Sequence, residues 1–101
     1  MRKDTTKGQR RKITFSLVAP QAREVHLVGE FNQWKAGAHP MKNDGNGVWR
    51  KSVMLPEGKF EYKFLVDSQW LADPANERVC TNCFGTKNSV VSVVKPSPRR
   101  M

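Results

Sequence analysis

The sequence contains few cysteines, few histidines and no long apolar run, and each shortage excludes a class of proteins. Two cysteines cannot form a disulfide framework, so we expect a protein of the reducing cytoplasm. No apolar stretch approaches the roughly 20 residues that a membrane span needs. None follows the basic first residues either, so we expect no membrane partner and no secretory signal.

The shortage of catalytic side chains argues against an enzyme. The two histidines, His26 and His39, lie in a β-rich run and in a loop before Pro40, and the carboxylates form no recognisable paired motif. No glycine-rich phosphate loop precedes a helix. We therefore predict a non-enzymatic chain without catalytic residues and without a cofactor.

The two cysteines form a single C-x-x-C motif at Cys80 and Cys83. A structural zinc site needs four ligands, and the sequence has no second C-x-x-C and no downstream pair of histidines. Adding His26 and His39 would complete a Cys₂His₂ set, but their spacing matches no familiar zinc site. The pattern favours two loop thiols without a metal, with a disulfide under oxidising conditions as the alternative.

The net charge of +9 is concentrated at the two ends of the chain. Residues 1–12 contain six bases and one acid and residues 95–101 three bases, whereas residues 13–94 contain nine bases and eight acids. We therefore predict a basic N-terminal tail over 1–12, one folded domain over 13–94 and a basic C-terminal tail over 95–101. We expect no nucleic-acid partner for the near-neutral domain, and nucleic-acid binding through the tails stays an alternative.

The middle of the chain alternates apolar and polar residues in short runs, the pattern of half-buried strands. Phe60, Tyr62 and Phe64 share one face of such a run, which leaves Lys63 on the other face. No segment keeps the helical period, and turns rich in Gly, Pro and Asn recur at intervals of about 10 residues. The sequence predicts an all-β fold, an antiparallel β-sandwich with strands over residues 13–18, 25–29, 48–55, 60–66 and 89–94.

Two tryptophans lie outside the apolar stripes, each beyond the end of a predicted strand. Trp34 follows the run 25–29, and Trp70 follows the run 60–66. An exposed indole is costly unless it is used, and its flat apolar ring suits the C–H face of a sugar. Lys, Asn and Thr side chains can hydrogen-bond the hydroxyl rim of such a ligand. On pattern alone, both rings could equally fold back into the core.

Six ordered segments of the chain carry a family resemblance. They are residues 25–34 (VHLVGEFNQW), 47–49 (GVW), 55–64 (LPEGKFEYKF), 66–70 (VDSQW), 73–74 (DP) and 85–89 (GTKNS). In these segments the sequence resembles carbohydrate-binding module family 48. This family includes the glycogen-binding domain of AMP-activated protein kinase β subunits and the early-set domain of branching enzymes and isoamylases. The resemblance covers most of the chain and implies an immunoglobulin-like β-sandwich of the early-set type.

The resemblance also implies sugar-binding residues on the predicted strands and loops. Trp34 and Trp70 correspond to the two tryptophans that stack on α-1,4-linked glucose units. Lys63 corresponds to a lysine that hydrogen-bonds sugar hydroxyls, in agreement with its place opposite the apolar face of its strand.

Three further residues in and before the last strand match the family pattern to different degrees. Asn88 corresponds to an asparagine that binds hydroxyls, and Thr86 to a neighbouring polar contact. Phe84 lies where kinase subunits have a leucine that can thread the curve of a glucan helix. An aromatic ring there keeps the apolar character and changes the shape.

We therefore predict a non-catalytic, glycogen-binding-like module whose ligand is an α-glucan polysaccharide or a maltooligosaccharide. The alternative is a regulatory module that docks onto a kinase partner or an enzyme of glycogen metabolism. Some enzyme-attached family members have lost sugar binding. The joint presence of Trp34, Lys63, Trp70 and Asn88 argues that this chain retains it.

Overall fold

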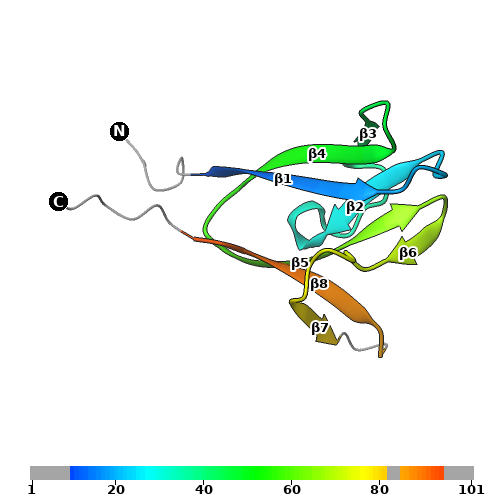
Figure 1. Ribbon diagram of the computed structural model, residues 1–101. Helices are drawn as coiled ribbons and strands as arrows, with labels where there is room; N and C mark the ends of the chain where they lie inside the picture. Colours follow the sequence, from blue (N-terminus) through cyan, green and yellow to red (C-terminus); the bar gives the residue numbers. More distant parts are fainter. Residues whose placement is uncertain (1–9, 82–84, 95–101) are drawn as a thin grey trace.

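The computed structural model describes residues 10–81 and 85–94, which form two antiparallel sheets packed face to face (Figure 1). The smaller sheet has the order β1–β4–β3, with strands at Arg11–Val18, Val48–Leu55 and Lys42–Asn43 respectively. The larger sheet has the order β2–β5–β8–β7, with strands at Val25–Gly29, Gly58–Val66, Lys87–Val93 and Val79–Thr81. A short strand β6 (Gln69–Leu71) pairs with β5, and a 3-10 helix η2 covers Glu30–Asn32. The predicted antiparallel β-sandwich is confirmed.

The hydrophobic core lies between the two sheets because alternate residues of each long strand face the other sheet, and most of these are apolar. Phe15 of β1 and Tyr62 and Phe64 of β5 are all buried in it. The rings of Phe15 and Tyr62 meet edge to face with centroids 4.9 Å apart, so an aromatic pair joins the sheets. Trp49 of β4 is buried beside them, and its Nε1 donates to the carbonyl oxygen of Ala19 at 3.0 Å.

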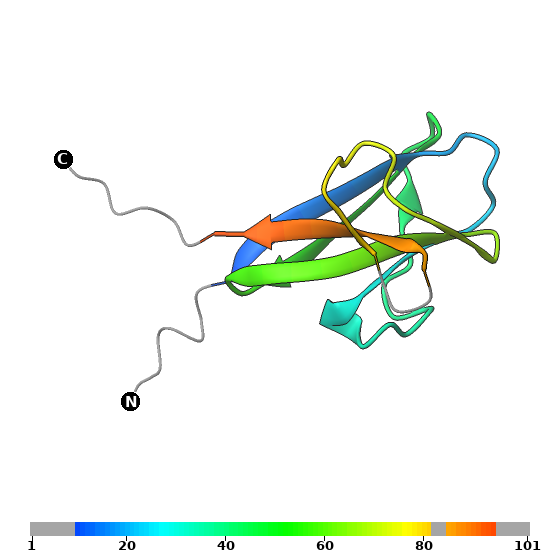
Figure 2. The same ribbon diagram turned by 90° about the horizontal axis from the view of Figure 1, so that it is seen from below.

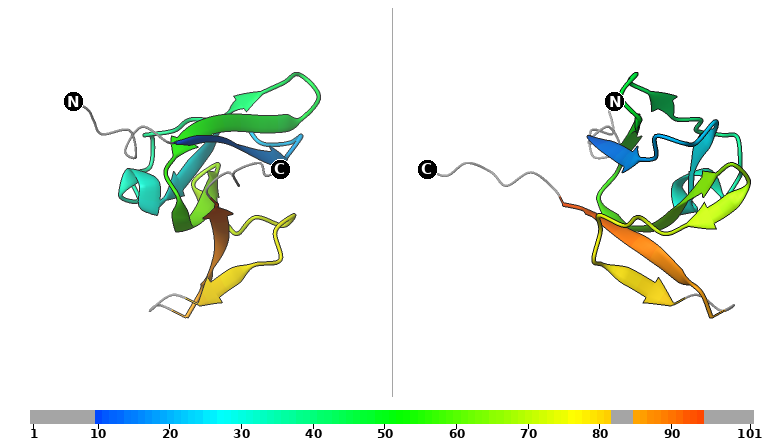
Figure 3. Two further views of the ribbon diagram at one scale, coloured as in Figure 1. Left: turned by 90° about the vertical axis from the view of Figure 1, so that its left-hand side faces the viewer. Right: turned by 45° about the vertical axis from the view of Figure 1, so that its right-hand side comes forward.

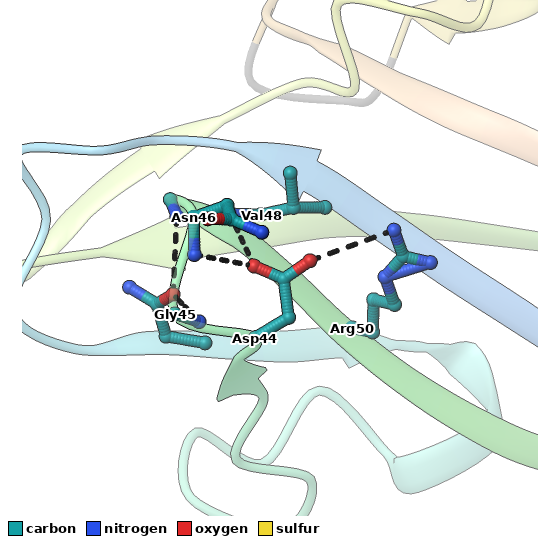
Figure 4. Close-up of polar contacts among 7 residues, drawn as sticks. Asp44, Gly45, Asn46, Val48 and Arg50 are labelled. Carbon is teal, nitrogen blue, oxygen red and sulfur yellow. Dashed lines mark hydrogen bonds and ion pairs between the residues drawn. The ribbon is translucent and has the colours of Figure 1, made fainter.

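The turn between β3 and β4 is held by side-chain hydrogen bonds to its own backbone (Figure 4). One carboxylate oxygen of Asp44 accepts from the backbone N–H groups of Asn46 at 2.8 Å and Val48 at 3.3 Å. Its other oxygen lies 3.7 Å from Nη2 of Arg50. Gly45 takes a φ of 97°, which glycine adopts without steric cost. The run of Asn, Asp and Gly residues therefore forms the tight turn that its composition predicts.

A polar network inside the fold fixes the segment between β6 and β7. The hydroxyl of Tyr62 donates to Asp73 Oδ2 at 2.6 Å and accepts from Asn76 Nδ2 at 3.0 Å. Asn76 Nδ2 also donates to the carbonyl of Val90, and the N–H of Asp73 donates to Ser89 Oγ at 2.7 Å. Burial, followed by the bond to Asp73, raises the pKa of Tyr62, so its hydroxyl stays a donor. The network ties this segment to β5 and β8.

The larger sheet extends beyond the smaller one at its β8–β7 side. Figure 3 shows β7 reaching past the area that β1 and β4 cover, and Figure 2 shows β8 running alongside β5. The strands β3, β6 and β7 were not predicted, because two or three residues are too few to show an alternation. No helix among the described residues is long and apolar enough to cross a membrane. Most of the predicted tails, residues 1–9 and 95–101, lies outside the described part of the chain.

Candidate functional site

The side of the larger sheet that faces away from the core, called the outer face below, carries most of the residues singled out above. Along β5, Phe64 turns into the core, so its neighbours Lys63 and Leu65 turn to the outer face. The register places Val28 of β2 opposite Lys63, and antiparallel partners share a face. Val28 lies outside the core cluster and is nevertheless 0% exposed. The outer face is therefore covered at this point and is not a bare solvated surface.

Lys63 and Thr86 are joined across the outer face. Nζ of Lys63 donates to Oγ1 of Thr86 at 3.1 Å. This bond links β5 to the loop that leads into β8 and holds the long lysine side chain over the sheet. An ammonium group carries three N–H donors, and the bond to Thr86 uses one of them.

Glu61 and Asn88 form a second pair on the same face. Nδ2 of Asn88 donates to Oε1 of Glu61 at 2.9 Å, and the backbone N–H of Glu61 donates to Oε1 of Glu30 at 2.8 Å. Asn88 is only 4% exposed, so in this structure it holds the Glu61 carboxylate in place. Glu61 is not among the site residues predicted from the sequence. The sequence nevertheless indicates that Glu61 belongs to the site, because residues two apart on a strand share a face and Glu61 lies two residues before Lys63.

Trp70 lies in strand β6, a strand that the sequence does not predict beyond residues 60–66. Asp67 and Ser68, with φ values of 46° and 72°, reverse the chain directly after β5, so the next residues return as a strand. Trp70 pairs with Leu65 and therefore shares the outer face with Lys63. It is 53% exposed, which rules out burial between the sheets.

Trp34 lies at the edge of the larger sheet, just after η2, and is 38% exposed. Its backbone N–H donates to the carbonyl of Gly29, the last residue of β2, at 2.9 Å. A Cβ on Gly29 would lie 2.7 Å from the carbonyl oxygen of Glu61, so only glycine lets this turn approach β5 so closely. The strands β2 and β6 pair with the same residues of β5 from opposite sides, which puts their backbones about 10 Å apart.

Cys80 lies opposite Asn88 in the register between β7 and β8 and is exposed. The carboxylate of Glu61 is the main cause that raises the pKa of the Cys80 thiol, which favours its protonated form. Its sequence partner Cys83 and the predicted sugar contact Phe84 lie outside the described residues. Among the residues that the structure describes, no group of three or more His, Cys, Asp or Glu side chains could hold a metal ion.

Both histidines have close polar neighbours. Nε2 of His26 lies 2.6 Å from Oε2 of Glu24. Nδ1 of His39 lies 2.8 Å from Nδ2 of Asn32, and burial together with the charge of Lys51 lowers the pKa of His39. Neither histidine contacts a nucleophile among the bonds that the structure gives it.

The outer face thus combines two kinds of contact surface. Trp34 and Trp70 are both partly exposed; Trp70 shares the outer face with Lys63, and the backbone of Trp34 follows the edge strand β2 on the other side of β5. Charged and amide side chains in linked pairs lie on the same face as Trp70. Aromatic rings pack against apolar faces, whereas the ammonium of Lys63 donates and the carboxylate of Glu61 accepts hydrogen bonds. This chemistry suits a ligand with flat apolar faces and a polar rim. The fold and the site together define a β-sandwich binding module.

The comparison with protein families identifies the class more closely. Residues 3–85 match the model of carbohydrate-binding module 48, the isoamylase N-terminal domain. The chain belongs to the carbohydrate-binding module 48 family, as the sequence resemblance predicts.

Curated relatives and a solved structure agree with this assignment. The chain is 42% identical over 73 residues to 5'-AMP-activated protein kinase subunit beta-1 of Sus scrofa, a match that covers 72% of this chain and 57% of that protein. It is 40% identical over 73 residues to subunit beta-2 of Homo sapiens, covering 72% of this chain and 26% of the human protein. The chain therefore spans only part of the length of these relatives. A maltogenic amylase from S. marinus superposes with a TM-score of 0.75 at 22% identity, over 89% of this chain and 14% of the amylase, which shows the shared fold.

Proposed function

We propose that the outer face binds an α-1,4-linked glucan and catalyses no reaction on it. The ligand would be a glycogen-like or starch-like polysaccharide or a maltooligosaccharide. One observation carries the proposal. A chain of a carbohydrate-binding family holds Trp34 and Trp70 at 38% and 53% exposure on the two sides of a polar strand.

The two indoles would provide the stacking surfaces for glucose units. A glucose ring has an apolar face of C–H bonds, and an aromatic plane covers that face without losing a hydrogen bond. By the family resemblance, Trp34 and Trp70 are the residues that stack. Their placement on both sides of β5 supports contact with more than one glucose unit along a chain.

The linked polar pairs would bind the hydroxyl groups. Lys63 would donate to sugar oxygens from the position where Thr86 holds it, and Glu61, held by Asn88, would accept from sugar hydroxyls. Side chains that are already held lose little rotamer freedom on binding. An open face that buries little area nevertheless supports only weak binding, roughly micromolar to millimolar.

The family resemblance assigns three further contact residues to the same module. Thr86 and Asn88 would add polar contacts beside Lys63, and Phe84, from the chain between β7 and β8, would add an apolar one. The module would extend over residues 13–94 and act in the reducing cytoplasm, the setting that its cysteine usage favours.

A fluorescence titration of the full chain tests the proposal. Maltoheptaose should change the tryptophan emission in a saturable way, because a sugar ring would replace water against Trp34 and Trp70. The buried Trp49 should emit equally with and without the sugar. Cellohexaose, whose β-linked chain has a different curvature, serves as the matched control and should leave the emission unchanged. An equal response to both sugars, or to neither, would reject α-glucan binding.

A second candidate function is docking onto a kinase or an enzyme of glycogen metabolism. It is favoured by the curated relatives, which are named as subunits of 5'-AMP-activated protein kinase. A docking module should still copurify with its protein partner after Trp34→Ala and Trp70→Ala. A glucan-binding module should lose retention on immobilised starch after either change.

A further inference from the structure

Trp34 lies in a strained turn that its surroundings must hold. Gln33 and Trp34 have φ values of 54° and 58°, in the left-handed region that residues with a Cβ enter only at an energetic cost. Two successive residues in this region persist where neighbouring contacts leave no alternative, and such strain tends to occur at functional sites. The contacts that hold this turn therefore control the position of Trp34.

Asn32, the residue before this turn, supplies those contacts. Its Oδ1 accepts from the N–H of Gly29 at 3.0 Å, and its Nδ2 donates to the carbonyl of Leu27 at 3.0 Å. The same Nδ2 lies 2.8 Å from Nδ1 of His39, and the carbonyl of Asn32 accepts from the N–H of Lys35 at 3.1 Å. Asn32 is buried, so its bonds to Gly29 and Leu27 are shielded from water. One side chain thus ties the turn to β2 and to the loop that carries His39.

The partners of Asn32 decide the protonation state of His39. The backbone N–H of Gly29 can only donate and the carbonyl of Leu27 can only accept, so the Asn32 amide has one possible orientation. Its second N–H hydrogen therefore points at Nδ1 of His39, which must present a lone pair. His39 is thus neutral, with its proton on Nε2.

The surroundings of His39 favour the same neutral form. Burial first, and then the positive charge of Lys51 on β4, lower the pKa of His39 from its usual value of 6.5. The helix η2 contributes the Asn32 amide and the ring of Phe31, whose centroid lies 6.1 Å away, and β2 contributes the N–H of Leu27, which donates to the carbonyl of His39 at 2.9 Å. As the pH falls, His39 is protonated in the unfolded chain before it is protonated in the folded protein. Its contribution to the free energy of unfolding is therefore complete above pH 6.5 and is lost as the pH falls below that value.

A second histidine lies close by and provides a matched control. His26 of β2 forms a bridge with Pro40, the residue after His39, and its Nε2 faces the carboxylate of Glu24 at 2.6 Å. These two are the titratable groups that β2 and its preceding residue bring to this region. Neither of them bonds to Asn32 in the structure.

We propose that Asn32 and His39 are positioning residues for Trp34, and that protonation of His39 disables them. A proton on Nδ1 would set two N–H donors face to face, which would break the bond to Asn32 and loosen the strained turn. The inference rests on the proposed glucan binding and extends it, because binding should weaken as the pH falls from neutral into the acid range.

The test measures two signals of the full chain between pH about 7.5 and about 5, the range in which histidines titrate. One is the affinity for maltoheptaose. The other is the NMR signal of the Trp34 indole N–H, assigned with Trp34→Phe. The wild type should lose about fivefold in affinity, the net value of one hydrogen bond, while the indole signal shifts with the midpoint of the His39 ring signals.

Three variants separate positioning from a general effect of acid. His39→Asn puts an amide oxygen near the place of Nδ1, so it should bind like the wild type at neutral pH and lose the pH dependence. His39→Leu lacks any acceptor and should bind weakly at both pH values. His26→Asn should keep the pH dependence of the wild type.

The outcomes decide two separate claims. Constant affinity and a constant indole signal in the wild type, or an undiminished pH effect in His39→Asn, would overturn the positioning role. If His39→Asn does not fold, the wild type decides alone, because different midpoints for the indole and the His39 ring would reject the role. If maltoheptaose binds at no pH, the glucan proposal fails, and the indole titration still decides whether His39 positions Trp34.

Discussion

The two sheets of the sandwich share one core and present very different surfaces to solvent. On the smaller sheet, the outward residues of β4 include Ser52, whose hydroxyl lies 2.8 Å from that of Thr14, and Met54, which is 52% exposed. On the larger sheet, the outward residues of β5 include Glu61 and Lys63, each bonded to a side chain from another part of the chain. Strand alternation lets both central strands build the same core while their outward residues differ.

The difference lies in organisation and not in polarity. Both outer surfaces contain charges and an exposed apolar residue. Only the larger sheet has partly exposed tryptophans, with Trp34 in the turn after the edge strand β2 and Trp70 in β6 on the other side of β5. The comparison therefore predicts that substitutions matched in type and exposure will affect glucan binding on one sheet and leave it unchanged on the other.

The largest expected effect is a loss of stability when a side chain of the core, which supports both surfaces, is removed. Phe64→Ala deletes a fully buried ring and should lower the free energy of unfolding by about 3–5 kcal/mol. That loss approaches the whole stability of a small domain, about 5–15 kcal/mol. The neighbouring Leu65→Ala changes the outer face and should cost about 1 kcal/mol. Urea denaturation followed by circular dichroism measures both, and equal losses would contradict the inward and outward assignment of β5.

The next effect compares two side chains of matched exposure on opposite sheets. Trp70 and Met54 are 53% and 52% exposed. Trp70→Ala should weaken maltoheptaose binding about tenfold or more, as expected for an aromatic residue that anchors a contact surface. Met54→Ala should leave the affinity unchanged. Isothermal calorimetry tests both variants, and a similar loss in the two would mean that the site is not confined to the larger sheet.

A smaller effect compares two lysines. Lys63→Met keeps the apolar stem and removes the ammonium group, so binding should fall about fivefold through the loss of sugar hydrogen bonds. Lys42→Met, on the exposed strand β3 of the smaller sheet, should have no effect. Little salt dependence is expected in either case, because the ligand is uncharged. Steep weakening of wild-type binding with salt would instead favour an anionic ligand.

The smallest expected effect is a change in the alkylation rate of Cys80, which tests whether Glu61 and Cys80 share the outer face. The carboxylate of Glu61 raises the pKa of the Cys80 thiol, and less thiolate is then available at neutral pH. In a Cys83→Ser background, Glu61→Gln should therefore speed iodoacetamide alkylation of Cys80 by about twofold, the scale of an exposed charge interaction. An unchanged or slower rate would separate the two residues.

The long strands could be predicted from the sequence because their alternation is set locally. In residues 48–55 and 60–66 the buried side chains, Trp49, Leu55, Tyr62 and Phe64, all lie on one face of their strand, and the structure has strands β4 and β5 there. The short strands β6 and β7 are exposed at all three of their positions, so no pattern marks them. They exist because distant pairing creates them, β6 on β5 and β7 on β8.

The candidate site was predictable in its residue types and only partly in its geometry. Trp34 and Trp70 could be selected as unpatterned aromatics, and their exposure follows from contacts that the sequence does not display. The bond between Asn32 and His39 was not foreseeable, because the two residues lie seven positions apart in chain that forms no strand and has no regular period. The place of Glu61 on the outer face could be predicted from its spacing to Lys63. Its role in the site could not, because a single carboxylate in a strand forms no recognisable motif.

The central claim is that the outer face of the larger sheet recognises α-linked glucose polymers. A ¹H–¹⁵N NMR titration of the full chain with maltoheptaose tests it most directly, because each backbone and indole N–H reports its own surroundings. The account predicts saturable shifts at the two indoles of Trp34 and Trp70 and at Lys63, with the signals of β1 and β4 unmoved. Shifts that cluster on β1 and β4, or a spectrum that the sugar does not change, would contradict it.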